Sequence, residues 1–313
     1  MSMLLPKPIF LTEEDKTERS DFLKSLKHFP SCLFSDAKLL KKTIQGQVKI
    51  VRYAPMNDAL VVLKSASVPM VVSKKSSTGL RVIEDLCTEI KLLQMLRDSG
   101  DTHRNIVQFV DAFSDGSHVH LVLEYCAKGE LFDVIEQEGP LTECTARECF
   151  GQLVDAVKFL HQKDIVHLDI SLENIFVSSE GICKLGDFGV ARKLDKKEEE
   201  LKAVDIDRPG KTSYMSPEIF AGGAYDPRKA DVFSLGVVLF MLVFGFPPFE
   251  QPTAEDGRFR RISSGQLKRL LRDWGLLDQV SLEVIELLGA MFQKESERPS
   301  IEEIENHPWF DIK

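Results

Sequence analysis

Two short segments of this 313-residue chain carry side chains that could act on a phosphate group. Residues 167–174 read HLDISLEN, and residues 187–189 read DFG. Phosphoryl transfer proceeds by positioning the reactants and neutralising phosphate charge, so it requires a base, metal-binding carboxylates and cations. Asp169, Asn174 and Asp187 each have an ordinary interpretation as a cap, loop or turn residue. Their ordered combination is far more specific than any one of them.

The two segments resemble the catalytic loop and the metal-binding loop of the eukaryotic protein kinase family, serine/threonine type. The resemblance covers residues 36–313, and the ending HPWF at residues 307–310 is similar to kinases of the calcium/calmodulin-dependent type. It implies that Asp169 accepts the proton of a substrate hydroxyl, while Asn174 and Asp187 hold Mg²⁺ against the phosphates of ATP. Glu218 stands in SPE where the family carries APE, and Arg298 lies where its partner is expected.

The resemblance also assigns a lysine and a glutamate in the amino-terminal part. Lys64 ends the run ALVVLK at the family's V-A-I-K position, and would bridge the ATP phosphates to Glu89. The segment between them, residues 65–81, is rich in Ser and Lys and is expected to be a flexible insertion.

The nucleotide pocket is the most altered part of the pattern. The glycine-rich loop falls on residues 41–48, KKTIQGQV, in which only Gly46 survives, so Lys41 and Thr43 should stiffen the loop. The resemblance places these residues around adenine and ribose: Val48, Val62, Leu123, Glu124, Cys126, Glu130 and Phe176.

Two family residues are replaced within the catalytic loop. The usual Arg is Leu168, and the usual Lys is Ser171, a loss that could cost about 100-fold to 1000-fold in rate. Lys211, however, stands where the family has a Thr that faces that Lys. We expect an exchange in which Lys211 reaches Asp169 and the γ-phosphate while Ser171 accepts its hydrogen bond. The alternative is that Lys211 is an exposed loop lysine.

Leu168 bears on regulation. The Arg it replaces normally binds a phosphate on the activation segment, so phosphorylation of Thr212 or Ser213 would lack its usual partner. We expect activity without that modification.

Hydrophobic periodicity predicts the elements that position these residues. The resemblance implies a bilobal α+β protein kinase fold, with an extension at residues 1–35, a β-rich N-lobe at about 36–125 and a helical C-lobe at about 126–313. A helix is predicted before Pro30, a hairpin over residues 48–63 and a strand over 119–125. Further helices are predicted over residues 82–96, 144–161, 231–244, 265–274, 282–292 and 301–307.

Composition limits the partners and the compartment. With 43% hydrophobic residues and a net charge of −9, the chain is typical of a globular protein that does not bind nucleic acid. Its six cysteines form no C-x-x-C pair, which favours reduced thiols in the cytoplasm. Residues 1–11 lack the features of a signal peptide, and the apolar run at 232–249 is expected to be a core helix rather than a membrane span. We expect a monomer.

The function favoured by these patterns is ATP- and Mg²⁺-dependent phosphorylation of Ser or Thr in proteins. Glu173 could select basic substrates, or be an ordinary surface carboxylate, and the acidic run at residues 198–200 is expected to be solvated. The alternative is a pseudokinase that acts as a binding scaffold. A small-molecule phosphotransferase is a third class, but it should lack the segment that ends at Glu218 and its partner Arg298.

Overall fold

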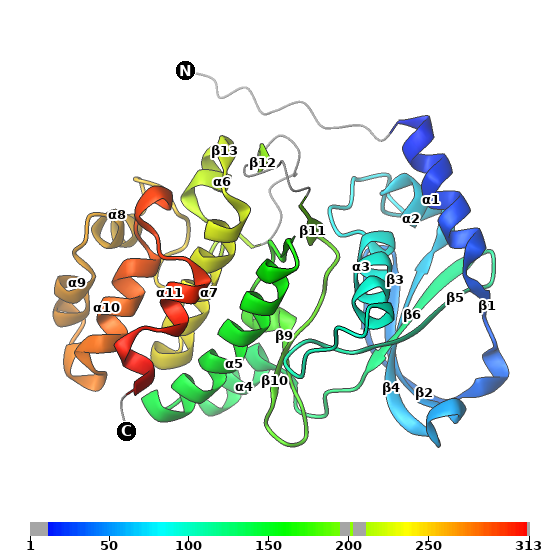
Figure 1. Ribbon diagram of the computed structural model, residues 1–313, viewed down its shortest axis with the longest axis horizontal. Helices are drawn as coiled ribbons and strands as arrows, with labels where there is room; N and C mark the ends of the chain where they lie inside the picture. Colours follow the sequence, from blue (N-terminus) through cyan, green and yellow to red (C-terminus); the bar gives the residue numbers. More distant parts are fainter. Residues whose placement is uncertain (1–11, 195–200, 203–210, 312–313) are drawn as a thin grey trace. The chain divides into compact units, whose positions relative to one another are not determined.

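The computed structural model describes residues 12–194, 201–202 and 211–311 (Figure 1). Residues 1–11, where no signal peptide is expected, and the acidic run at 198–200 lie outside the described residues. The chain divides into two compact units. The sheet unit comprises residues 12–127 and 187–190, and the helical unit comprises residues 128–186 and the described residues from 191 onward. This mixed α+β architecture is the predicted fold class.

The sheet unit is built on a six-stranded sheet in the order β1-β5-β6-β4-β3-β2. The predicted hairpin is confirmed as β3 and β4, joined through Asn57 and Asp58, both of which have positive φ angles that Asn and Asp adopt readily. All neighbouring strands are antiparallel except β1 and β5, which are parallel. The strands are β1 (Lys27–His28), β2 (Phe34–Lys42), β3 (Gly46–Tyr53), β4 (Ala59–Ser67), β5 (Phe109–Ser114) and β6 (His118–Glu124).

Among its described residues, the sheet unit contains three α-helices: α1 (Glu13–Ser25), α2 (Val68–Ser73) and α3 (Leu86–Asp98). Helix α1 begins at Thr12, which forms a capping box with Asp15. Helix α2 lies within the segment expected to be a flexible insertion, and Pro69 fits the first turn of this helix. Helix α3 starts later than the predicted residue 82, because Asp85 caps it.

The amino-terminal extension is part of the core of the sheet unit. Strand β1 extends the sheet beyond β5, and the ring of Phe29 stacks on His120 with centroids 3.9 Å apart. The ring of Phe34 stacks on Tyr53 at 4.7 Å. Burying these rings removes apolar surface from water, which favours the attachment of the extension.

The helical unit contains eight helices among its described residues. They are α4 (Leu131–Glu138), α5 (Glu143–Gln162), α6 (Pro217–Ala221), α7 (Pro227–Phe244), α8 (Gly257–Ser263), α9 (Leu267–Asp273), α10 (Leu282–Met291) and α11 (Ile301–Glu305). Strands β7 (Gly129–Glu130), β9 (Ile175–Val177) and β10 (Cys183–Leu185) form one small sheet. Two further pairs are β8 (Ile165–Val166) with β11 (Arg192–Lys193), and β12 (Leu201–Lys202) with β13 (Ala224–Tyr225).

Helix α7 is the centre of the helical unit, in contact with α5 and α10 (Figure 1). It starts at Pro227, after the cap Asp226, and every residue from 230 to 244 is buried. Gly245 ends the helix with a φ of 80°, which a glycine adopts without strain. The prediction of a core helix is confirmed. In the described part of the chain, no helix is long and apolar enough to cross a membrane.

Candidate functional site

In the sheet unit, Lys64 lies between two carboxylates. Its Nζ atom is 2.8 Å from Oε2 of Glu89 and 3.2 Å from Oδ1 of Asp187. Lys64 comes from β4, and Glu89 from the first turn of α3, where its side chain is only 1% exposed. The structure thus brings together the three residues that the sequence assigned to phosphate binding and metal binding in this unit.

One ammonium therefore serves two carboxylates. Burial acts to lower the pKa of Lys64, but the charges of Asp187 and Glu89 outweigh it and raise that pKa. Burial raises the pKa of Glu89 to about 7, with a further contribution from Asp187, while Lys64 opposes the rise. Lys64 therefore stays charged, and Glu89 becomes protonated more easily than an ordinary glutamate.

The segment that follows Asp187 is tied to the start of α3. Asp187 has a φ of 57°, a left-handed conformation that is uncommon outside glycine and that Asp tolerates. The Gly189 carbonyl accepts a 2.8 Å hydrogen bond from the N–H of Asp85, the cap of α3. Phe188 is fully buried. The backbone of this loop is therefore held to the helix that carries Glu89.

Three of the predicted adenine-pocket residues are neighbours in the sheet. Val62 on β4 pairs with Leu123 on β6, and Val48 on β3 pairs with Lys64. Glu124 follows Leu123, and its carboxylate accepts a 2.6 Å hydrogen bond from the N–H of Gln108. A buried Cys126 lies two residues further on.

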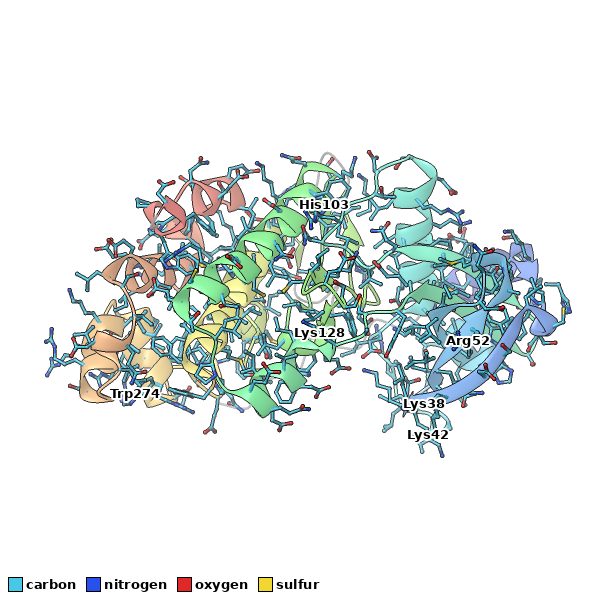
Figure 2. The ribbon with its side chains drawn as sticks, turned by 90° about the horizontal axis from the view of Figure 1, so that it is seen from below. Lys38, Lys42, Arg52, His103, Lys128 and Trp274 are labelled. Atoms are coloured by element: carbon cyan, nitrogen blue, oxygen red, sulfur yellow. The ribbon has the colours of Figure 1, made fainter. Side chains whose placement is uncertain are left out.

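The glycine-poor loop forms the tight turn between β2 and β3. Thr43 and Gly46 exchange backbone hydrogen bonds of 2.9 and 3.4 Å across it. A methyl group at Gly46 would lie 1.9 Å from the carbonyl oxygen of Ser65, so packing within the sheet already explains this glycine. The Gln45 side chain donates to the carbonyl of Met70 in α2, which ties the turn to that helix. Figure 2 shows Lys38 and Lys42 of the exposed strand β2 at the lower margin of this unit.

In the helical unit, the catalytic-loop residues Asp169 and Asn174 are in contact. The Asn174 Nδ2 atom donates to the Asp169 carbonyl at 2.9 Å and to its carboxylate at 2.8 Å. These bonds fix the orientation of both side chains. Elsewhere in this unit Glu130 of β7 pairs with Phe176 of β9, as neighbours in the small sheet.

A buried aspartate that the sequence did not mark as functional holds the catalytic loop. Asp231 accepts hydrogen bonds from the N–H groups of His167 and Leu168, at 2.9 and 2.8 Å, and contacts His161 at 2.9 Å. Leu168 has a φ of 63°, which is rare for leucine, so the loop is held in a conformation it would not adopt alone. The available signal was a lone carboxylate at the head of the apolar run of α7.

The structure does not show the predicted exchange between Lys211 and Ser171. Lys211 lines the same small pocket as Asp169, but its ammonium pairs with the carboxylate of Glu173. The Oγ atom of Ser171 is buried and has no hydrogen-bond partner among the described residues, so the predicted bond from Lys211 is not formed there. The charge of Glu173 explains the difference, because an ammonium gains more from a carboxylate than from a hydroxyl.

Two other sequence-derived features concern the same loop region. Leu168 is buried in the pocket that Met215 and Ile219 also line, so it supplies an apolar side chain where the resemblance expects a cation. Arg298 makes two hydrogen bonds to the carboxylate of Glu218, at 2.6 and 3.2 Å, as expected for that pair.

Comparison with known proteins gives one family and several relatives. The family described as "Protein kinase domain" matches residues 45–310. The chain is 36% identical over 264 residues to the putative sperm motility kinase W of Mus musculus, covering 84% of this chain and 47% of the relative. It is 31% identical over 243 residues to CBL-interacting serine/threonine-protein kinase 24 of Arabidopsis thaliana, covering 77% and 51%. The chain thus spans about half the length of these relatives.

Proposed function

Because the chain belongs to the protein kinase family, we propose that it transfers the γ-phosphoryl group of ATP, with Mg²⁺, to Ser or Thr of proteins. The observation that carries the proposal is the ammonium of Lys64 paired with both Glu89 and Asp187. A binding scaffold has no need for a phosphate-binding cation, metal-binding oxygens and a base together. The printed names of several relatives describe serine/threonine kinases, which supports the same class.

Within this proposal each residue has a role set by its chemistry. Asp169 accepts the proton of the substrate hydroxyl, and Lys64 binds the ATP phosphates. Mg²⁺, when bound, supplies positive charge to the phosphates. The Asp187 carboxylate and the Asn174 amide oxygen would hold it, and such oxygen donors suit Mg²⁺. Asn174 uses its nitrogen on Asp169, so its oxygen is the atom suited to a metal.

The acceptor is proposed to be a protein rather than a small molecule. The Arg298–Glu218 pair holds the SPE segment that the resemblance assigns to protein kinases and that a small-molecule phosphotransferase should lack. A preference for basic substrates receives less support, because Lys211 already neutralises Glu173. We also propose that the protein acts as a monomer in the cytoplasm. This part of the proposal is supported by composition.

The scaffold alternative draws support from the glycine-poor turn and from Ser171. The two functions differ in one assay: ATP with Mg²⁺ on an array of Ser, Thr and Tyr peptides, together with nucleotide binding to the same preparation. Phosphate on Ser or Thr peptides supports the proposal. Nucleotide binding without transfer, or transfer to Tyr alone, would contradict it.

The protonation of Glu89 predicts a pH dependence. Because the pKa of Glu89 is raised to about 7, its charge is lost as the pH falls through that value, and its ion pair with Lys64 is lost with it. We expect kcat/KM for ATP to fall on the acid side of neutrality. In Glu89→Gln the rate should be lower at high pH and this acid limb should be absent. If kcat/KM of Glu89→Gln still falls below neutral pH as it does in the parent, the pH dependence belongs to another group.

Activity without phosphorylation of the 211–218 segment is a second expected result. Thr212 is exposed, and Leu168 offers no cation to a phosphate placed there. Replacing both Thr212 and Ser213 by Ala should change kcat/KM by less than about threefold, as measured on phosphatase-treated protein. A chain that turns over only after an upstream kinase has modified this segment would refute the prediction.

A further inference from the structure

Helix α1 is joined to the start of α3 by a buried ion pair. The guanidinium of Arg19 contacts both carboxylate oxygens of Asp85, with Nη2 2.8 Å from Oδ1. The same Nη2 donates to the carbonyl of Val71 in α2 at 2.7 Å. The side chains of Arg19 and Asp85 are 11% and 8% exposed. Helix α1 precedes residues 45–310, so this pair lies partly outside the matched kinase domain.

Asp85 is also the residue that organises the start of α3. Its Oδ1 atom accepts hydrogen bonds from the N–H groups of Cys87 and Thr88, at 2.9 and 3.4 Å. Its carbonyl accepts the N–H of Glu89 at 3.0 Å, and its own N–H donates to Gly189 at 2.8 Å. One residue thus connects the helix that carries Glu89 with the loop that carries Asp187.

The charge of Asp85 depends on Arg19. Burial acts to raise the pKa of Asp85, but the hydrogen bonds and charge of Arg19, together with Lys74, hold that pKa below its usual value. Removing Arg19 would leave a buried carboxylate with only Lys74, at 3.6 Å, as a cationic partner in the described contacts. A buried charge that loses its partner is strongly unfavourable. The Asp85 carboxylate would then become protonated, or the loop around it would rearrange.

Other contacts keep α1 alongside α3. Lys91 of α3 pairs with Glu18 at 3.1 Å, and its ammonium lies 4.9 Å from the ring centroid of Phe22. Leu23 is 1% exposed. Figure 1 shows α1 beside α2 and α3 in the sheet unit, in agreement with the contacts between them.

We propose that Arg19 is a positioning residue for phosphoryl transfer, and that docking of α1 holds Glu89 and Asp187 in the arrangement that pairs both with Lys64. The inference rests on the proposed function and adds a control element to it. Any change that separates α1 from α3 would therefore weaken the pairing of Lys64 with Glu89 and Asp187, although α1 itself contacts neither ATP nor substrate.

The test compares Arg19→Met, Arg19→Lys and the control Lys24→Met in the full chain. Lys24 lies on the same helix, but it is exposed and pairs only with Asp21 in the contacts of the described residues. We expect Arg19→Met to lower kcat/KM by about tenfold or more at a temperature where circular dichroism shows it folded. Arg19→Lys should recover part of the rate, because one ammonium can still pair with Asp85. Lys24→Met should match the parent.

Amide hydrogen exchange separates this inference from the proposed function. In Arg19→Met, the amides of residues 87–89 should exchange about tenfold faster than in the parent, while those of β6 stay unchanged. If the parent transfers no phosphate but Arg19→Met still exchanges faster than the parent at residues 87–89, the proposed function is contradicted, while the role of Arg19 in holding the start of α3 is supported. A lower melting temperature with unchanged kcat, KM and exchange at residues 87–89 would overturn the inference, because α1 would then be structural only.

Discussion

Replacing Asp187 by Asn is expected to reduce the rate of phosphoryl transfer by about 1000-fold. A metal ligand stabilises transition-state charge by several kcal/mol, and about 4 kcal/mol corresponds to that factor. The change also removes one of the two carboxylates beside Lys64. Asn is the suitable replacement because Asp187 has a positive φ, which Asn tolerates. The measurement is kcat/KM with Mg²⁺ and ATP on a peptide that the parent phosphorylates.

Asp36→Asn is the matched control for this variant. Asp36 belongs to the same unit, has a similar φ of 52° and pairs with Arg52 at the surface, where both side chains are largely exposed. Exposed ion pairs contribute little, so this variant should retain the rate of the parent. Equal rates for the parent and Asp187→Asn would show that Asp187 is not a metal ligand in the reaction.

Replacing Lys211 by Met is expected to lower kcat by about 100-fold to 1000-fold, the range for loss of one charge-stabilising group. Lys211 shares a pocket with Asp169 and is half-exposed. The exchange hypothesis requires its ammonium to leave Glu173 for the γ-phosphate when ATP binds. Lys268→Met, an exposed lysine of α9, is the control and should leave kcat unchanged. If the two variants behave alike, Lys211 is an ordinary surface lysine.

The exchange hypothesis also predicts a rescue. The double variant Ser171→Lys with Lys211→Thr restores the family pattern and should recover at least about tenfold of the rate lost in Lys211→Met. Glu173→Gln releases Lys211 without removing its charge, so it should retain most of the activity of the parent. Loss of activity in Glu173→Gln to the level of Lys211→Met would contradict a direct role for the ammonium.

The local elements could be predicted from the sequence because their signals are local. The β3–β4 hairpin follows from a turn at Asn57 and Asp58 between apolar runs, and α7 follows from its apolar length. Element ends were less well predicted: Asp85 caps α3 inside its predicted segment, and Asp226 caps α7 ahead of the apolar pattern from which that helix was predicted. The Lys64–Glu89 pair was placed by its resemblance to the family, not by spacing.

The remaining contacts join residues that are distant in sequence. Arg19 and Asp85 are 66 residues apart, and neither belongs to a motif that would connect them. Asp231 was visible as a carboxylate at the head of an apolar helix, but its bonds to the loop at His167 and Leu168 depend on tertiary packing. The pairing of Lys211 with Glu173 was not predicted, because the two residues lie in different segments and no motif connects them.

The central claim is that the chain catalyses phosphoryl transfer rather than only binding nucleotide. The most direct measurement is the amount of phosphoserine and phosphothreonine peptide formed per molecule of purified chain at saturating ATP and Mg²⁺, alongside ATP binding to the same sample. We predict many phosphorylated peptides per chain. A chain that binds ATP but forms no phosphorylated peptide would contradict the claim and identify the protein as a scaffold.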